Sequence, residues 1–284
     1  MSTAVWQCRD RALDLGQPVV MGVLNVTPDS FSDGGHFSDR DAALARALRM
    51  IDEGAGIIDI GGESTRPGAA PASLDQELTR VIPVIEILRR ESPVFISIDT
   101  SKSGVMRAAC DAGADIINDV RALTEPDAVA AAAATRAGVC LMHMRGEPHT
   151  MQNSPRYDDV VAEVHAFLSA RVAACNAAGI DLPRLAVDPG FGFGKLPPHN
   201  LALLKHLAAF HSLGVPLVVG LSRKSMLAKL TGRAVDERTA GSVALAAIAV
   251  LNGARIVRAH DVAATVDAAR VAAAVALGEA FDDT

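Results

Sequence analysis

Acceptor side chains follow three of the short apolar runs in this chain of 284 residues. Asp99 and Asp188 each end such a run, and Asn118 ends another. Each of them alone could cap a following helix, which is a common role of Asp and Asn after a strand. Three acceptors brought together could instead pair with the N–H edge of a flat heterocycle, such as a guanine-like or pterin ring, and fix its orientation.

A second set of residues suits anions. The GGESTRPGA turn presents Thr65 and Arg66, and an arginine there can grip a phosphate with two hydrogen bonds. Arg258 and His260 end the last apolar run. The SRKS segment at 222–225 opens a helix after the preceding run, where barrels commonly bind anions at backbone N–H groups. These groups together predict a phosphate-binding site.

The first apolar run continues into NVTPDSFSDGG at 25–35, a stretch rich in Pro, Gly, Ser and Asp. Such residues oppose regular structure, so we expect a long loop, with too few apolar residues to be ordered in the free protein. Asn25 at its start offers a neutral oxygen ligand for Mg²⁺, which often binds through substrate phosphates. An Asn at a strand end is also a common turn former, and this alternative stays open.

The DPGFGFGK segment at 188–195 has neither the dinucleotide-binding nor the P-loop spacing. We therefore interpret it as a turn that lets Phe193 line the site. The histidines show no metal-ligand spacing, and no HExxH or Ser-His-Asp signature is present, which argues against a zinc hydrolase or a serine nucleophile. The implied chemistry is electrostatic.

Eight apolar runs alternate with alanine-rich segments of helical period, which is typical of a (β/α)8 barrel. Strands are expected at 19–23, 57–60, 94–98, 115–117, 139–142, 185–187, 217–219 and 255–257. The first helix has Leu44, Ala47, Leu48 and Ile51 on one face, a capping box at Ser38 and Asp41, and a stop at Gly54. Later helices are expected at 74–91, 102–112, 126–137, 157–178, 200–211, 236–252 and 262–280.

An open doubly wound sheet would alternate in the same way, but its ligand groups cluster at one switch point. Here almost every expected strand ends in a polar residue. A barrel places its site at the C-terminal ends of most strands, so the distribution favours the barrel. No linker or composition shift interrupts the series, and we expect one domain over 1–284.

The composition limits the partners. The net charge of -6 and pI near 5.7 argue against a nucleic-acid partner, which usually requires a basic excess. The four cysteines form no CxxC pair and are expected to be buried free thiols. The N-terminus carries charges where a signal peptide needs an apolar core, and no apolar run reaches the roughly 18 residues of a membrane span, so we expect no membrane partner and a cytoplasmic protein.

Nine motifs occur in series: GVLNVTPDSFSDGG, GGESTRPGA, SIDTSK, INDV, LMHMRGEPHTMQ, DPGFGFGK, GLSRKSML, RTAGS and RAHDV. In this order they closely resemble the dihydropteroate synthase family of bacterial folate biosynthesis, from about Val19 to the last helix. The resemblance implies a single (β/α)8 barrel that condenses 6-hydroxymethyl-7,8-dihydropterin diphosphate with p-aminobenzoate, giving diphosphate and 7,8-dihydropteroate. It also implies Mg²⁺, a homodimer through the late helices, and a sulfonamide target. Ala228 and Ala259 depart from the family's usual residues, but neither is at a ligand position.

The resemblance also implies the site residues, by motif match. The pterin would be held by Asp99, Asn118, Met142, Asp188, Phe193, Lys224 and Arg258. The diphosphate would be held by Asn25 with Mg²⁺, and by Thr65, Arg66, Arg258 and His260. The p-aminobenzoate would be framed by Phe31, Pro67 and Ser225. The catalytic set would be Asp29 and Asp33, facing a developing cation, with Arg66 and Lys224.

This chemistry needs positioning and fixed charge more than a nucleophile, because diphosphate leaves readily once its charge is neutralised. Two other functions share part of the pattern. A methyltetrahydrofolate-dependent methyltransferase would use the same acceptors without holding a diphosphate, and a non-catalytic pterin binder would keep the fold without turnover. The TPDSFSD, STRPG and SRKS segments argue against the first of these.

Overall fold

The computed structural model describes residues 5–27, 36–63, 71–146, 151 and 155–277. Eight strands lie parallel in one sheet, in the order β8-β7-β6-β5-β4-β3-β10-β9. They are β3 (Val19–Asn25), β4 (Ile57–Gly61), β5 (Phe95–Asp99), β6 (Ile116–Asp119), β7 (Gly138–Met142), β8 (Leu185–Asp188), β9 (Val218–Gly220) and β10 (Ile256–Ala259). A bridge between Val187 and Leu217 joins the two edge strands and closes the barrel. The predicted barrel is confirmed, with every expected strand within two residues of its place.

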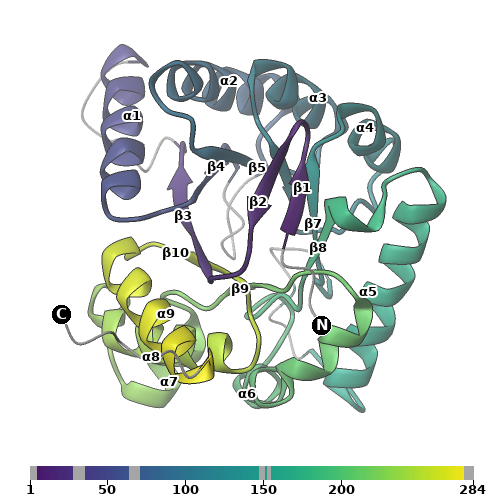
Figure 1. Ribbon diagram of the computed structural model, residues 1–284, viewed down its shortest axis with the longest axis vertical. Helices are drawn as coiled ribbons and strands as arrows, with labels where there is room; N and C mark the ends of the chain where they lie inside the picture. Colours follow the sequence, from purple (N-terminus) through teal and green to yellow (C-terminus); the bar gives the residue numbers. More distant parts are fainter. Residues whose placement is uncertain (1–4, 28–35, 64–70, 147–150, 152–154, 278–284) are drawn as a thin grey trace.

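Helices surround the barrel, and Figure 1 shows them as an outer ring. They are α1 (His36–Asp52), α2 (Leu74–Glu91), α3 (Ser103–Ala112), α4 (Ala128–Thr135), α5 (Val160–Ala177), α6 (Pro197–Lys205), α7 (Ser225–Thr231), α8 (Thr239–Leu251) and α9 (Val262–Leu277), with 3-10 turns η2 (Leu182–Arg184), η3 (Leu207–Leu213) and η4 (Val235–Glu237). The main apolar core lies between their inner faces and the outward side chains of the strands. In the described part of the chain, no helix is both long enough and apolar enough to cross a membrane.

Two helix predictions are wrong in detail. The first helix begins at His36, so Ser38 lies inside it and is not its N-cap. The expected helix at 200–211 is divided at His206 into α6 and η3, because the chain tightens to a 3-10 turn there. A capping box does occur at α2, where Ser73 and Gln76 satisfy each other's backbone N–H groups.

Side chains inside the barrel form layers. Near the N-terminal ends of the strands the inward residues are apolar: Met21, Ile57, Ile116, Cys140, Ala186, Val218 and Ile256. Because side chains alternate along a strand, the residues two positions farther on also face inward. In five of these strands that next residue is polar or is a long thioether: Asp59, Asn118, Met142, Asp188 and Arg258. Among the described inward positions, polar side chains therefore begin at this upper layer and continue toward the C-terminal ends of the strands, where Asn25 and Asp99 lie.

A hairpin that the sequence analysis did not predict closes the N-terminal end. It consists of β1 (Val5–Cys8) and β2 (Arg11–Asp14), and Figure 1 shows it across the middle of the ring. Trp6 is fully buried on the apolar layer, and its indole N–H donates to the carbonyl of Arg184 at 2.9 Å. The hairpin separates the bottom of the barrel from water, leaving the opposite end as the functional one.

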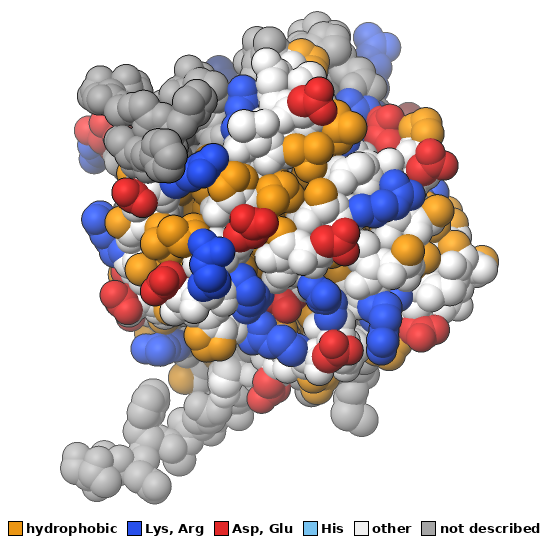
Figure 2. All heavy atoms as spheres, turned by 90° about the horizontal axis from the view of Figure 1, so that it is seen from above, with side chains coloured by type: hydrophobic (Ala, Val, Ile, Leu, Met, Phe, Trp, Pro, Cys, Tyr) orange, Lys and Arg blue, Asp and Glu red, His pale blue; other side chains and the backbone are white. Residues whose placement is uncertain are grey.

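All four cysteines are buried and free, as expected. On the face shown in Figure 2, basic and acidic side chains lie interspersed among apolar ones. That mixture agrees with the small net charge and forms no large basic field on this face.

Candidate active site

The strand ends bring the predicted acceptors to one end of the barrel. Asp99 is the last residue of β5, Asp188 is the last residue of β8, and Asn118 lies on β6 in register with Asp99. Asn118 and Asp188 are buried, and neither Asp99 nor Asn118 caps a helix. The alternative in which these residues are ordinary caps is therefore wrong for Asp99 and Asn118.

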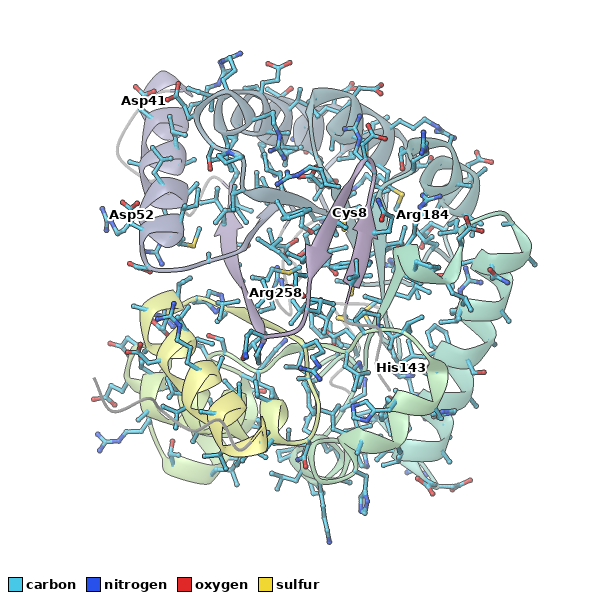
Figure 3. The ribbon with its side chains drawn as sticks, in the orientation of Figure 1. Cys8, Asp41, Asp52, His143, Arg184 and Arg258 are labelled. Atoms are coloured by element: carbon cyan, nitrogen blue, oxygen red, sulfur yellow. The ribbon has the colours of Figure 1, made fainter. Side chains whose placement is uncertain are left out.

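Arg258 on β10 joins two carboxylates near the barrel axis, and Figure 3 shows it in the middle of the ring. Its Nε donates to Asp59 Oδ2 at 2.6 Å, and one of its terminal nitrogens donates to Asp99 Oδ2 at 2.8 Å. Asn118 Nδ2 donates to the same oxygen of Asp59 at 3.2 Å. The guanidinium thus bonds side chains from two other strands, and Asp59 links Asn118 from a third.

These contacts set the charges of the group. Burial raises the pKa of Asp99 to about 7, while Arg258 opposes the shift and Asp59 adds to it. Burial alone would lower the pKa of Arg258, but Asp59 and Asp99 outweigh this effect and raise it. Arg258 therefore remains a cation, and Asp99 is a carboxyl whose proton can be lost or gained near neutrality.

Asp188 divides its two oxygens between the fold and the site. Oδ1 accepts the N–H of Gly190 at 2.7 Å, and Oδ2 lies 4.0 Å from where a side chain on Gly220 would begin. Burial raises the pKa of Asp188 to about 6, against the opposing effects of the Gly190 hydrogen bond and of Lys224. At neutral pH this carboxylate can accept from a ligand.

Lys224 lies at the N-cap position of α7, directly after the segment that follows β9. Its ammonium group lies 4.2 Å from the ring centre of Phe193, which comes from the turn after β8. Burial and the nearby Arg258 lower the pKa of Lys224 to about 8. The two side chains therefore lie against each other and form one wall at this end of the barrel.

The predicted anion residues adjoin this wall. His260 follows β10, and its Nδ1 lies 3.0 Å from Ser222 Oγ. Burial lowers the pKa of His260 to about 4, and the positive charge of Arg258 is the second cause of this shift. The ring is therefore neutral at physiological pH. Arg223 has a left-handed backbone and pairs with Asp261 through two hydrogen bonds, at 3.0 and 2.5 Å. These contacts hold the segment that carries Lys224.

Asn25 ends β3 in register with Gly61 of β4. A side chain on Gly61 would begin 3.8 Å from both Asn25 Oδ1 and Asp99 Oδ2, so the glycine leaves these two oxygens accessible from one space. In the described residues, no group of three or more His, Cys, Asp or Glu side chains is placed to hold a metal ion. Asn25 accordingly fits an ion bound mainly through substrate oxygens and water.

The remaining predicted residues have different outcomes. Met142 is buried at the end of β7, and Ser225 is exposed as the first residue of α7. The others lie outside the described residues: Asp29, Phe31, Asp33, Thr65, Arg66 and Pro67. Their roles, and the expected disorder of the loop at 27–35 in the free protein, stay predictions.

Sequence reasoning missed two charged residues at this end. Asp59 is fully buried within β4, and a search for polar residues after apolar runs does not find it because it lies inside such a run. The signal was present, since a carboxylate in the middle of a buried strand is costly without a partner. Lys195 ends the DPGFGFGK turn, where the sequence pattern assigns it no role, although it is 2% exposed.

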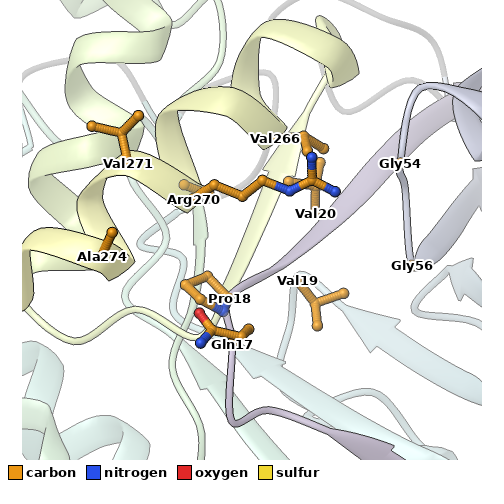
Figure 4. Close-up of a pocket in the computed structure, with 11 residues that line it drawn as sticks. Gln17, Pro18, Val19, Val20, Gly54, Gly56, Val266, Arg270, Val271 and Ala274 are labelled. Atoms are coloured by element: carbon orange, nitrogen blue, oxygen red, sulfur yellow. The ribbon is translucent and has the colours of Figure 1, made fainter. Parts of the chain in front are cut away.

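A cavity of about 620 Å³ lies away from these residues, beside the first half of β3. Figure 4 shows Val19, Val266 and Arg270 among the residues that line it. None of the predicted site residues contributes to it, and its place near the start of β3 is the end opposite the polar layer. Charge and strand topology place the active site at the other end.

Known proteins are similar to this chain over most of its length. A family model described as pterin binding enzyme matches residues 21–260. Dihydropteroate synthase of Escherichia coli (strain K12) is 55% identical over 260 residues, covering 92% of this chain and 92% of that protein. A structure of Xanthomonas albilineans dihydropteroate synthase with 4-aminobenzoic acid is similar at a TM-score of 0.91 and 53% identity, covering 96% of this chain and 98% of that one. A Yersinia pestis dihydropteroate synthase structure with a sulfonamide drug has a TM-score of 0.91 and 51% identity, covering 95% and 98%. With its polar barrel layer and this extent of similarity, the chain belongs to the pterin-binding enzymes, in the dihydropteroate synthase family.

Proposed function

We propose that this chain condenses 6-hydroxymethyl-7,8-dihydropterin diphosphate with p-aminobenzoate, releasing diphosphate and 7,8-dihydropteroate. The observation that carries the proposal is the polar layer in which Arg258 links Asp59 and Asp99 while Asp188 keeps one oxygen for a ligand. Such a layer suits a flat ring with several N–H donors. Family membership supports the same reaction.

The pterin would bind in this layer. Its N–H edge would face Asp188 and Asn118, while Phe193 and Met142 would pack on its apolar parts. Arg258 would lie against the ring, because it is fixed near the barrel axis by two carboxylates. Lys224 would donate to the ring from the wall that it shares with Phe193.

In the reaction, the bond between the methylene carbon and the diphosphate oxygen breaks, and the arylamine nitrogen forms a new bond to that carbon and loses a proton. The electron-rich ring stabilises the cationic methylene. Arg258 and neutral His260 would face the departing diphosphate, together with Thr65 and Arg66. Asp29 and Asp33 would face the cation, and Phe31, Pro67 and Ser225 would frame the arylamine.

Asn25 would hold Mg²⁺ together with diphosphate oxygens and water, which is the manner of binding that this ion prefers. When bound, the ion would neutralise charge on the leaving group. Asn25 itself would orient the diphosphate from the end of β3, next to the space that Gly61 leaves open. The neutral amide oxygen of Asn25, a ligand type that suits Mg²⁺, supports its assignment to the ion.

The decisive experiment supplies purified protein with both substrates and measures diphosphate and dihydropteroate. Equal amounts of the two products support the proposal. Pterin binding without diphosphate release would indicate a non-catalytic binder, and methyl transfer from methyltetrahydrofolate would indicate the methyltransferase alternative. Inhibition by a sulfonamide that competes with p-aminobenzoate would show that this chain also binds the class of drug present in the Yersinia pestis structure.

We also propose that the protein is a cytoplasmic homodimer. Large apolar side chains are exposed on the two late helices, where Val271 and Val275 of α9 are 66% and 70% exposed and Leu251 of α8 is 50% exposed. Their burial against a second copy would remove apolar surface from water. Val271→Asp combined with Val275→Asp is expected to give a monomer by light scattering, whereas the same change at exposed Leu182 is expected to leave the dimer intact.

The proposed cytoplasmic location is supported by the cysteines, because buried free thiols are consistent with a reducing compartment.

A further inference from the structure

A buried lysine lies directly behind the turn that carries Phe193. Lys195 is 2% exposed, and its Nζ lies 2.8 Å from His143 Nδ1, 2.9 Å from the Gly190 carbonyl oxygen and 3.1 Å from that of Phe193. The carbonyl of His143 is a fourth acceptor, at 3.3 Å. The three carbonyl oxygens are acceptors, and the neutral ring of His143 accepts at Nδ1 in the tautomer that carries its proton on Nε2, which matches an ammonium group as the donor.

Other side chains fasten the same turn from outside. The N–H of Gly192 donates to Asn200 Oδ1 at 2.8 Å, and Tyr157 donates its hydroxyl to the carbonyl of Gly194 at 2.9 Å. Gly190 has φ of +71°, and a side chain there would overlap the carbonyl oxygen of His143. The turn has no regular secondary structure of its own, so these inserted side chains determine its conformation.

The turn connects two residues of the pterin site. It begins at Asp188, whose Oδ1 accepts the N–H of Gly190, and its tip presents Phe193 to Lys224. Lys195 bonds the carbonyls of both Gly190 and Phe193, so it spans the turn between these two functional positions. His143 anchors the lysine to the segment that follows β7, and Figure 3 places this histidine on the side of the ring near α5.

We propose that Lys195 is a positioning residue for pterin binding: its buried ammonium ties the 189–194 turn to His143, so that Phe193 and Asp188 are held at the geometry the ring requires. The inference rests on the proposed function, since it names a residue that supports the pterin site without touching the pterin. It predicts a defect that is specific for the pterin and spares the diphosphate.

Burying the charged group of Lys195 costs free energy, and packing alone would not require a charged side chain there. Burial lowers the pKa of Lys195 to about 7, and an apolar side chain of the same length would avoid this cost. The charged or titratable groups that act on it are Asp188 from β8, Lys224 after β9, Arg145 and His143 after β7, and His199 from α6. Of these, only Asp188 carries a negative charge, and it is the same residue that the turn must place.

The test compares Lys195→Met, which keeps the length and removes the donors, with Lys205→Met at an exposed position of α6. Calorimetry would measure an unreactive pterin, 6-hydroxymethylpterin, and inorganic diphosphate with Mg²⁺ as separate ligands. We expect the Kd for the pterin to rise about tenfold or more in Lys195→Met, because a small displacement of positioned groups has a large effect, while the Kd for diphosphate changes less than about twofold. Lys205→Met is expected to bind both like the parent.

A crystal structure of Lys195→Met gives the second measurement. A displaced 190–194 turn with Phe193 moved from Lys224 supports the proposal, and an unchanged turn or an unchanged pterin Kd overturns it. An equal loss of pterin and diphosphate binding also overturns it, because that result indicates a general structural role. If Lys195→Met does not fold, His143→Leu removes the anchoring acceptor and is judged by the same two ligands. Failure of the parent protein to bind pterin would reject the proposed function, and the position of the turn would still decide this inference.

Discussion

The two carboxylate oxygens of Asp188 have different roles, one in holding the turn after β8 and the other in ligand binding. Its Oδ1 accepts the N–H of Gly190, and only Oδ2 remains for a ligand. Arg258 has the corresponding double role, because the pairs that hold it also neutralise the carboxylates beside it. Single substitutions at these residues are therefore expected to alter ligand binding or activity in specific ways.

Asp188→Asn is expected to abolish pterin binding with the fold intact. The amide oxygen would take the hydrogen bond from Gly190, leaving the NH₂ group to face the N–H donors of the ring. An unpaired donor costs roughly 1 to 3 kcal/mol, and more where charge is involved. Calorimetry with the pterin substrate checks this, with exposed Asp267→Asn as the control. Parent-like affinity in Asp188→Asn would contradict the assignment.

Asp59→Asn is expected to lower activity although Asp59 ends no strand. It accepts from both Arg258 and Asn118, and removing one partner of a buried ion pair typically costs about 3 to 5 kcal/mol. We expect a fall in kcat/KM together with reduced stability to urea. The control is Asp52→Asn at the end of α1, on the outer ring. If both variants behaved like the parent, the role of the Arg258 pairs would have to be abandoned.

The pH dependence of kcat/KM for the pterin substrate should be bell-shaped. The pKa values of Asp188 and Asp99 are raised to about 6 and 7, so acidification below this range protonates the acceptors and lowers activity. The pKa of Lys224 is lowered to about 8, so its charge and its donor capacity are lost above that pH. Lys195, whose pKa is lowered to about 7, contributes to the same alkaline limb, so Lys224→Arg should remove only the contribution of Lys224, because a guanidinium stays charged. An alkaline limb that is the same in Lys224→Arg and in exposed Lys229→Arg would exclude Lys224 as its source.

Elements differ in how closely their sequence specifies them. The eight strands are short apolar runs buried on both faces, and their predicted positions agree with the structure because such runs have no stable alternative in water. Helix ends are set by caps and turns over one or two residues, which explains the errors at Ser38 and His206. The β1–β2 hairpin was missed because each strand has four residues and is stabilised by the barrel it covers.

Trp6→Ala tests the hairpin as an element. Trp6 is fully buried against the lowest layer of the barrel, so its truncation should cost about 3 to 5 kcal/mol of unfolding free energy. Activity at a temperature where the variant is folded should remain near that of the parent, because the hairpin lies at the end opposite the polar layer. Urea denaturation and steady-state kinetics measure the two effects, with Val5→Ala on the same strand as an exposed control. Lost activity in a fully folded Trp6→Ala would mean that the two ends are coupled.

The whole molecule assembles each subsite from distant segments. The expected p-aminobenzoate residues come from three of them, around Phe31, Pro67 and Ser225, and only Ser225 lies among the described residues. A subsite built in this way is completed by a ligand that contacts more than one segment.

We therefore expect p-aminobenzoate to bind weakly alone and more tightly when a pterin, Mg²⁺ and diphosphate are present. The coupling should be about 1 to 3 kcal/mol or more, as is usual between linked sites. Calorimetric titration with and without these ligands measures it, and benzoate, which lacks the amine, serves as the control ligand. Equal affinities in the two titrations would show that the second site is already formed.

The sequence by itself determined the barrel, the family and the groups at the strand ends, because alternation of apolar strands and helices is local and each of the nine motifs is contiguous. It placed Asp99, Asn118, Asp188 and Arg258 at one end of a barrel without indicating which of them would pair. Only the closed sheet decided that Arg258 lies between Asp59 and Asp99, residues 199 and 159 positions away along the chain. The same holds for Lys195, whose partner His143 is 52 positions away. Burial, and with it the cost of an unpaired charge, depends on which strands become neighbours, and that is a property of the tertiary structure alone.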